Sequence, residues 1–233
     1  MLARTNRVQN AAEVPLFITA DYEWGVGTPS TSFTELPGAM AYGAAGDPMY
    51  AELGGAVTAM EARAMGVNVL FAPTADVNNN PRNPIINTRS YGEDPQRVGE
   101  LAGAFVRGAQ AHGAFATLKH FPGHGSAPGD THDRLLDITD CHTERELELF
   151  CERLSRRDAS ASLALMTAHL LHRSIDPDRP ASLSPSWTGM IRDRFAFDGV
   201  IVTDALDMGA VAKRYTPIEA VLGATRAGAD LLL

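Results

Sequence analysis

Residues 115–125 read FATLKHFPGHG: a short apolar run, then a lysine and a histidine, then a loop rich in glycine and proline. An apolar run of this length bounded by turn residues predicts a buried strand. Pro122 and Gly123 prevent the chain from continuing as a helix. The stretch therefore predicts a strand whose carboxyl end presents Lys119 and His120 beside a loop whose backbone can approach a ligand closely.

The same pattern recurs along the chain. Five further apolar segments alternate with long helical segments, at residues 15–20, 67–73, 162–168, 199–203 and 229–233. Strands that alternate with helices predict βαβ units and a parallel sheet, and nearly continuous apolar strands suit a sheet covered on both faces. With 233 residues, of which 45% are hydrophobic, we expect one domain over residues 1–233, built as a (β/α)8 TIM-type barrel.

The helices between these strands have clear start and stop signals. A side-chain oxygen that can cap a helix precedes a proline at four places, Asp47-Pro48, Asp94-Pro95, Ser184-Pro185 and Thr216-Pro217. Thr143 and Glu146 have the spacing of a capping box, and Gly66 and Gly113 lie where two helices should stop. Residues 1–17 predict an amphipathic helix that runs into the first strand.

Polar residues follow most of the predicted strands directly. They are Asp21, Asp76, Lys119 with His120, His169, and Asp204. A lone aspartate after a strand is more often the cap of the next helix than a catalyst. The carboxyl ends of barrel strands converge on one mouth, however, so this recurrence predicts an enzyme site there.

Composition and charge exclude several classes of partner. The formal net charge of -8 and the scattered basic residues argue against nucleic acid. No apolar run approaches the roughly 20 residues that a membrane span needs.

We expect Cys141 and Cys151 to be free thiols, which favours a reducing compartment. The start lacks signal-peptide features, so a cytoplasmic location is expected; the alternative is periplasmic, if a signal sequence is missing from this chain.

The motif KHFPGHG at 119–125, followed by Asp130-Thr131-His132, resembles the signature of the β-N-acetylglucosaminidase (β-N-acetylhexosaminidase) branch of glycoside hydrolase family 3. Other segments resemble the same family in the same order over nearly the whole chain. They are PLFITADYEWG, FAPTADVN, NTRSYGEDP, LMTAH, PASLSP, FDGVIVTDALDMGAV and AGADLLL. The family's barrel has about two more βα units before PLFITAD and continues past the last strand. The resemblance thus implies a barrel that is incomplete at its N-terminus. The C-terminus is a second candidate for a missing strand.

The resemblance also implies roles for individual residues. Asp204 matches the nucleophile that forms a covalent glycosyl-enzyme with net retention, and His132 matches the proton donor, oriented by Asp130. Positions that bind sugar hydroxyls match Asp21, Arg89, Lys119 and His120, with His169 as a further candidate. No metal and no cofactor are implied. The expected substrate is a glycoside containing N-acetylglucosamine, from a muropeptide or a chitooligosaccharide.

Several alternatives stay open. A neutral imidazole does not repel phosphate, so the same site is compatible with a phosphorolytic N-acetylglucosaminidase or β-glucosidase. An inactive sugar-binding barrel remnant is a second alternative. A metal-dependent amidohydrolase needs a His-x-His pair, and no such pair occurs in this sequence. Trp24 either stacks on a sugar or fills the barrel mouth, and the sequence does not indicate an oligomeric state.

Overall fold

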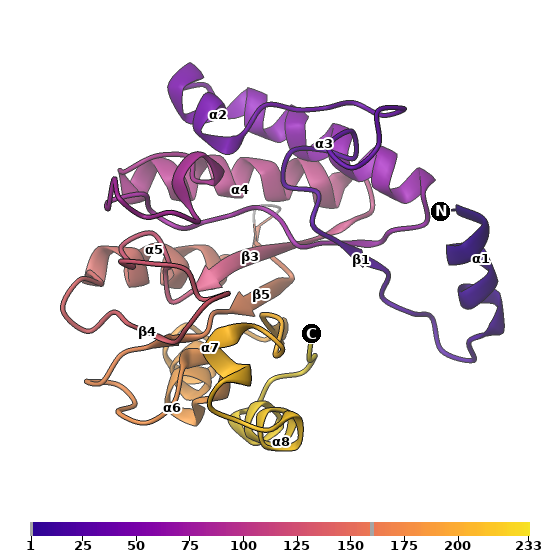
Figure 1. Ribbon diagram of the computed structural model, residues 1–233. Helices are drawn as coiled ribbons and strands as arrows, with labels where there is room; N and C mark the ends of the chain where they lie inside the picture. Colours follow the sequence, from indigo (N-terminus) through magenta and orange to yellow (C-terminus); the bar gives the residue numbers. More distant parts are fainter. Residues whose placement is uncertain (1, 159–160) are drawn as a thin grey trace.

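The computed structural model describes residues 2–158 and 161–233. At its centre is a parallel sheet of β1 (Thr19–Ala20), β2 (Val69–Leu70), β3 (Phe115–Phe121), β5 (Ala164–Thr167) and β7 (Val200–Thr203) (Figure 1). The strands lie side by side in the order of the sequence. A doubly wound sheet reverses its strand order at a switch point, whereas a barrel does not. The sheet is therefore the curled wall of an incomplete α/β barrel, as predicted.

The sixth predicted strand, at residues 229–233, is only partly formed. Leu231 bridges Val202 in parallel, and the amides of Asp230 and Leu231 both donate to the carbonyl of Ile201. The segment thus continues the sheet beyond β7, but by an isolated bridge instead of a ladder. A second, two-stranded parallel sheet of β4 (Leu136–Asp137) and β6 (Leu170–Leu171) was not predicted.

The helices are α1 (Leu2–Ala11), α2 (Ala39–Ala45), α3 (Pro48–Ala64), α4 (Pro95–Ala111), α5 (Glu144–Leu154), α6 (Pro185–Gly189), which continues as η3 (Met190–Arg194), α7 (Gly209–Ala212) and α8 (Pro217–Ala227), with single turns η1 (Asn87–Arg89) and η2 (Ala181–Leu183). Five helices begin at the predicted caps, and two of them end at the predicted glycines, whereas α2 and α7 were not predicted. All four predicted cap side chains accept a backbone amide, and the capping box of α5 is formed. Gly66 and Gly113 follow α3 and α4 with φ of 82° and 80°, a backbone region that favours glycine.

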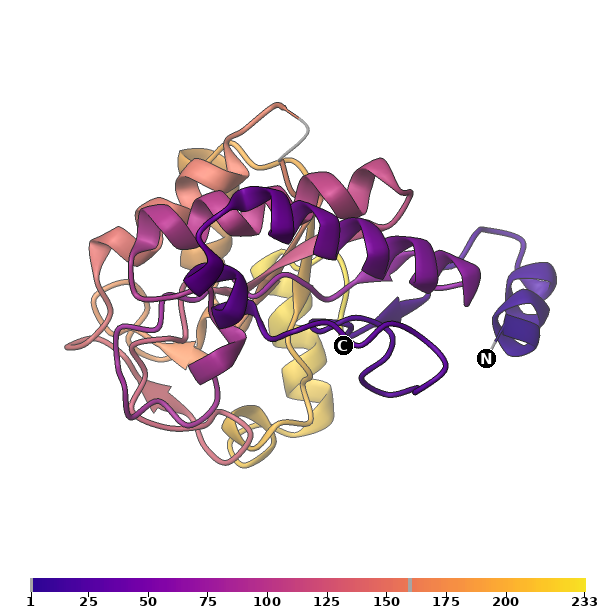
Figure 2. The ribbon, with the colours of Figure 1, turned by 90° about the horizontal axis from the view of Figure 1, so that it is seen from above.

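Helix α1 is the predicted N-terminal helix, although Met1 lies outside the described residues. It lies at the periphery of the molecule (Figures 1 and 2). Thr5, the one buried residue of this helix, donates a hydrogen bond to the carbonyl of Met65 at 3.0 Å. This contact ties the helix to the end of α3.

Helices α3 and α4 pack with their backbones in contact. A Cβ atom added to Gly55 would overlap the carbonyl of Phe105, and one added to Gly108 would overlap the carbonyl of Glu52. Each helix therefore presents a glycine to the backbone of the other. This close pair covers the outer face of the sheet above β3 (Figure 1).

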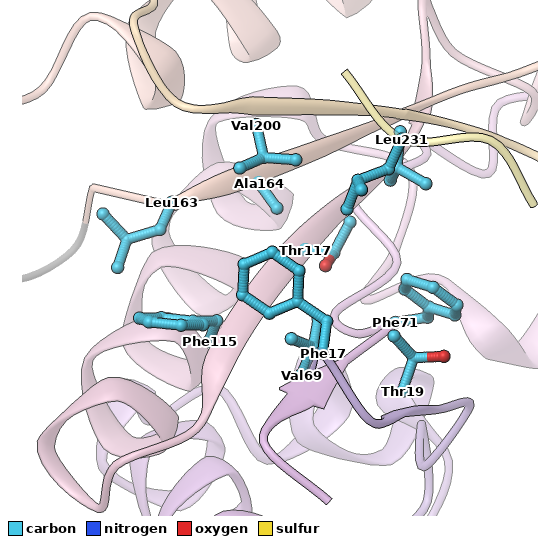
Figure 3. A pocket seen from close by; sticks show the side chains of 11 residues that line it. Phe17, Thr19, Val69, Phe71, Phe115, Thr117, Leu163, Ala164, Val200 and Leu231 are labelled. Carbon is cyan, nitrogen blue, oxygen red and sulfur yellow. The ribbon is translucent and has the colours of Figure 1, made fainter. Parts of the chain in front are cut away.

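The inner face of the sheet is an open apolar trough of about 250 Å³ (Figure 3). Alternate residues of a strand point to the same face. Two lining side chains therefore come from each of β3 and β7, and two more from β2 and the residue that follows it: Phe115 and Thr117, Val200 and Val202, and Val69 and Phe71. Asp21, Lys119 and Asp204 come two residues after the lining residues Thr19, Thr117 and Val202. The same alternation therefore brings these three polar residues to the carboxyl end of the trough.

Candidate active site

A buried cation cluster joins three of the predicted sugar-binding residues. The Nζ of Lys119, which is 1% exposed, lies 2.8 Å from Oδ1 of Asp21 and 2.6 Å from Oε1 of Glu23. Arg89 donates through Nε and Nη2 to the two carboxylate oxygens of Glu23, at 2.9 and 2.7 Å. The structure thus brings Asp21, Arg89 and Lys119 together through Glu23, a residue that the sequence analysis did not select.

The charge of Glu23 is fixed by these contacts. Burial raises the pKa of its carboxyl, but the charges of Lys119 and Arg89 and their hydrogen bonds outweigh burial, so the pKa lies well below its usual range. Glu23 is therefore ionised at neutral pH. It holds the two cations in place, while Asp21 is exposed to solvent and accepts from Nζ of Lys119.

His120 joins the cluster through a bulge in β3. The pairing of β3 with β5 shifts register between Leu118 and Phe121, and a bulge of this kind re-aims a side chain. Lys119 and His120 consequently both face the site. The His120 ring lies between two charged groups, with Nδ1 at 2.7 Å from Oδ2 of Asp76 and Nε2 at 3.4 Å from Nη2 of Arg89.

Asp204 stands at the end of β7 with its backbone fixed. Its amide donates to the carbonyl of Thr167, and its Oδ1 accepts from the amide of Ala205, each at 2.9 Å. Burial raises the pKa of the carboxyl, but His120, His169, the Ala205 amide and Lys119 together outweigh burial and lower it. The result is a partly buried carboxylate that stays ionised beside a cationic cluster.

His169 is fully buried and holds the segment after Asp204. Its Nδ1 lies 2.7 Å from Oγ of Ser182, and its Nε2 lies 2.8 Å from the carbonyl of Ala205. A neutral ring that donates from Nε2 and accepts at Nδ1 satisfies both contacts. Both ring nitrogens therefore have protein partners, so the geometry favours a positioning role over the contact with sugar that the sequence suggested.

The predicted Asp130–His132 pair is formed. Oδ1 of Asp130 lies 2.6 Å from Nδ1 of His132 and accepts from the His132 amide at 2.8 Å. Burial raises the pKa of the Asp130 carboxyl, but the amide and ring of His132 outweigh it, so the pKa is lowered. The His132 side chain is 60% exposed, so its ring is accessible to a ligand.

The loop that carries this pair docks on the segment after Asp204. The amide of Gly209 donates to the carbonyl of His132 at 2.9 Å, and the amide of Ala210 donates to the carbonyl of Thr131 at 3.0 Å. The start of α7 thus fixes the backbone of the pair. Asp204 lies five residues before Gly209 in the chain, so one short segment carries the predicted nucleophile and supports the predicted acid.

The loop that contains Asn83 fixes the backbone of the glycine-rich loop after β3. The buried Nδ2 of Asn83 donates to the carbonyls of His124 and Ala127, at 2.8 and 3.1 Å. A Cβ atom on Gly125 would overlap the carbonyl of Val77, so only glycine allows this approach. The sequence signal for these contacts of Asn83 is the asparagine-rich run 78–83, and no role was predicted for it.

The remaining predictions concern Trp24, the cysteines and metals. Trp24 packs on Gly38, whose added Cβ would lie 3.6 Å from the indole ring, and the indole nitrogen is buried; these contacts favour filling the mouth over stacking on a sugar. Cys141 and Cys151 are free thiols, as predicted. Within residues 2–158 and 161–233, no group of three or more His, Cys, Asp or Glu side chains is arranged to hold a metal ion. No helix of that same part of the chain has the length and apolar character to cross a membrane.

Comparison with known proteins identifies the family and the fold of the chain. The sequence profile described as "Glycosyl hydrolase family 3 N terminal domain" matches residues 1–233. The chain belongs to glycosyl hydrolase family 3. Within this family it is 36% identical over 262 residues to a protein named beta-hexosaminidase A from Pseudoalteromonas piscicida, which aligns with 100% of this chain. It is also 37% identical to a beta-hexosaminidase from Methylococcus capsulatus, over 100% of this chain and 70% of that protein.

A solved structure of the same family has the same fold. A family 3 beta-N-acetylglucosaminidase from Paenibacillus sp. str. FPU-7 superposes with a TM-score of 0.90 at 40% identity, over 98% of this chain. The chain spans less than half of the first relative and of this solved chain, 43% and 45% of their lengths. The matches that identify the fold and the family therefore cover nearly every residue of this chain.

Proposed function

We propose that residues 1–233 form one catalytic barrel domain of a retaining β-N-acetylhexosaminidase that removes terminal N-acetylglucosamine. One observation carries the proposal: an ionised, partly buried Asp204 and an Asp130–His132 pair are held by the two ends of a single short segment. A carboxylate nucleophile and a separate proton donor are the two groups that retaining glycoside hydrolysis needs. The relatives named as hexosaminidases support the choice of sugar.

In the first step, the sugar is held by the cluster around Lys119 while Asp204 attacks the anomeric carbon. A bond forms between a carboxylate oxygen and this carbon as the glycosidic C–O bond breaks. His132 gives its proton to the departing oxygen and becomes neutral. Although burial raises the pKa of the Asp204 carboxyl, His120, His169, the Ala205 amide and Lys119 together hold it below its usual value, which keeps the group ionised for the attack.

In the second step, the neutral His132 takes a proton from a water molecule, which attacks the same carbon and releases Asp204. Two displacements restore the original configuration. Imidazole titrates near neutrality and therefore serves as acid in one step and as base in the next. Asp130 orients the ring through Nδ1 and stabilises its charged form.

A second candidate function is phosphorolysis. The exposed His132 has no negative charge of its own in the second step, so phosphate can approach the glycosyl-enzyme in place of water. The product is then a sugar 1-phosphate. This candidate uses the same residues and differs only in the acceptor.

One set of assays separates the candidates. Purified protein is incubated with 4-nitrophenyl N-acetyl-β-glucosaminide and with the matching β-glucoside, each with and without phosphate. We expect faster release from the N-acetylglucosaminide, with free N-acetylglucosamine as product. Asp204→Asn should abolish release, whereas Asp198→Asn, an exposed carboxylate before the amino end of β7, should not. Sugar 1-phosphate would indicate the phosphorylase, and binding without turnover in the unmodified chain would indicate a sugar-binding remnant.

A further inference from the structure

The proposed mechanism does not use Asp76, although this carboxylate is fully buried beneath the site. Four contacts converge on its side chain. Oδ2 lies 2.7 Å from Nδ1 of His120, both carboxylate oxygens lie 3.2 Å from the His120 amide, and Oδ1 accepts from the His124 amide at 2.6 Å. A buried carboxylate is stable only when it is well paired and hydrogen-bonded, and these donors provide that pairing.

The contact with Nδ1 decides which nitrogen of His120 carries a proton. Burial raises the pKa of the Asp76 carboxyl, but His120 and the His124 amide outweigh it and keep the group ionised. An ionised carboxylate only accepts hydrogen bonds, so Nδ1 must donate. In the neutral ring Nε2 is then a bare acceptor, which agrees with its position 3.4 Å from Nη2 of Arg89, a group that only donates.

Asp76 also connects the site to both neighbouring loops. Through Oδ1 it fixes the amide of His124, in the loop that leads to the Asp130–His132 pair. Its own carbonyl accepts from Oγ of Ser90 at 2.6 Å, next to Arg89 in the chain. One buried residue therefore sets the backbone on both sides of the His120 ring.

We propose that Asp76 is a positioning residue that keeps His120 protonated at Nδ1, so that Nε2 accepts a hydrogen bond from a sugar hydroxyl, which displaces the long 3.4 Å contact with Nη2 of Arg89. The proposal rests on the proposed glycosidase function for its ligand, but the protonation of His120 is independent of it. In this arrangement His120 receives a hydrogen bond from the sugar. Lys119 and Arg89 supply the donors.

Asp76→Asn tests this role with almost no change in volume. The amide oxygen still accepts from the backbone amides of His120 and His124, but the NH2 group now faces Nδ1. Since Nδ1 must then accept, the proton moves to Nε2, which loses its ability to accept from a hydroxyl and points a hydrogen at Arg89. Asp176→Asn is the matched control: Asp176 is a buried carboxylate that accepts from the amides of Asp178 and Arg179 and from Oγ of Ser184, and within the described residues no histidine ring is bonded to its carboxylate.

The first readout is the 15N NMR spectrum of the histidine rings at a pH well above neutrality, with His120 assigned from its loss in His120→Gln. We expect a protonated Nδ1 and a bare Nε2 in the unmodified chain and in Asp176→Asn, and the reverse in Asp76→Asn. A proton on Nε2 in the unmodified chain overturns the proposal, as does an unchanged tautomer in Asp76→Asn. This readout needs no turnover, so it stands even if the proposed function fails.

The second readout is kcat/KM for nitrophenyl N-acetylglucosaminide and its monodeoxy analogues. Removal of the hydroxyl that donates to His120 should lower kcat/KM of the unmodified chain by about 10- to 100-fold. It should lower kcat/KM of Asp76→Asn far less, because this variant has already lost the hydrogen bond from that hydroxyl. Equal losses in both proteins at every deoxy position would refute the contact. Absence of turnover in the unmodified chain, with the expected tautomer, would count against the proposed function alone.

Discussion

Replacement of Gly209 by alanine tests the link between the nucleophile segment and the Asp130–His132 loop. A Cβ atom at position 209 would lie 2.6 Å from the carbonyl of Asp133 and closer still to the carbonyl of His132. Both contacts are backbone atoms, so no side-chain rotation relieves them. Ordinary contact begins at 3.4 Å, and the closer of the two carbonyls, that of His132, sets the shift, so the loop must retreat by about 1 Å.

A shift of this size has a definite kinetic consequence. Misplacing a catalytic group by about 1 Å costs roughly 100-fold in rate. The loss should fall on protonation of the leaving group, because His132 moves while Asp204 stays fixed by Thr167 and Ala205. We therefore expect kcat/KM to fall about 100-fold for glycosides with poor leaving groups, and by much less for nitrophenyl glycosides, which depart without much help from an acid.

The assay is a series of aryl N-acetylglucosaminides whose leaving groups span a wide range of acidity. Gly209→Ala should show a steeper dependence of kcat/KM on leaving-group acidity than the unmodified chain. Gly223→Ala is the control: it places the same methyl group in α8 at 3.6 Å or more from the nearest atoms of Leu183 and should leave the dependence unchanged. An equal loss on all substrates, or none, would refute the proposed link between the loop and proton transfer.

The remaining predictions concern the nucleophile, the acid and the buried ion pair. Asp204→Ala should abolish turnover while far-UV circular dichroism shows the fold intact, and azide should restore activity on nitrophenyl substrates; near-normal rates would reject the assignment. His132→Ala should lose far more rate on poor leaving groups than on good ones, and Asp130→Asn should show a milder form of the same change in the leaving-group series. Glu23→Gln should lower the free energy of unfolding by about 3 kcal/mol at neutral pH, because it removes the buried carboxylate that Lys119 and Arg89 share and leaves Asp21 as the remaining partner of Lys119. Since the folded pKa of Glu23 is depressed, its contribution is fully present above the unfolded pKa and is lost as pH falls toward the folded one; urea titrations of both proteins from neutral to acid pH should therefore converge.

Much of the architecture follows from local rules that the sequence displays directly. The caps at Asp47 and Asp94 were predictable because each signal lies within three residues of its own partner. The meeting of Asp21, Lys119 and Asp204 was predictable from their places after parallel strands, because the carboxyl ends of barrel strands converge on one mouth. Residues 229–233 show the limit of such rules: their apolar run indicates a strand, but the extent of pairing depends on the neighbouring chain.

The parts of the site that sequence reasoning missed depend on distant partners. Glu23 is separated from Arg89 by 66 positions, and nothing in the run around either residue indicates the other. Asp76 was recognised only as a polar residue after a strand, because its pairing with His120 requires the bulge in β3. His169 looked like a ligand for sugar, and only the positions of Ser182 and Ala205 show that both of its nitrogens are occupied.

The glycines at the interface of α3 and α4 limit which substitutions can raise the thermal stability of this protein. Glycine-to-alanine replacement within helices is a standard route to a gain of about 0.5–1 kcal/mol per site. At Gly55 and Gly108 the same replacement has the opposite sign, because the added methyl group meets the backbone of the neighbouring helix and forces the pair apart. Gly99, whose added methyl group would contact only the side chains of Leu149 and Arg153 at 3.5 Å or more, is the position in α4 where such an engineering programme should begin.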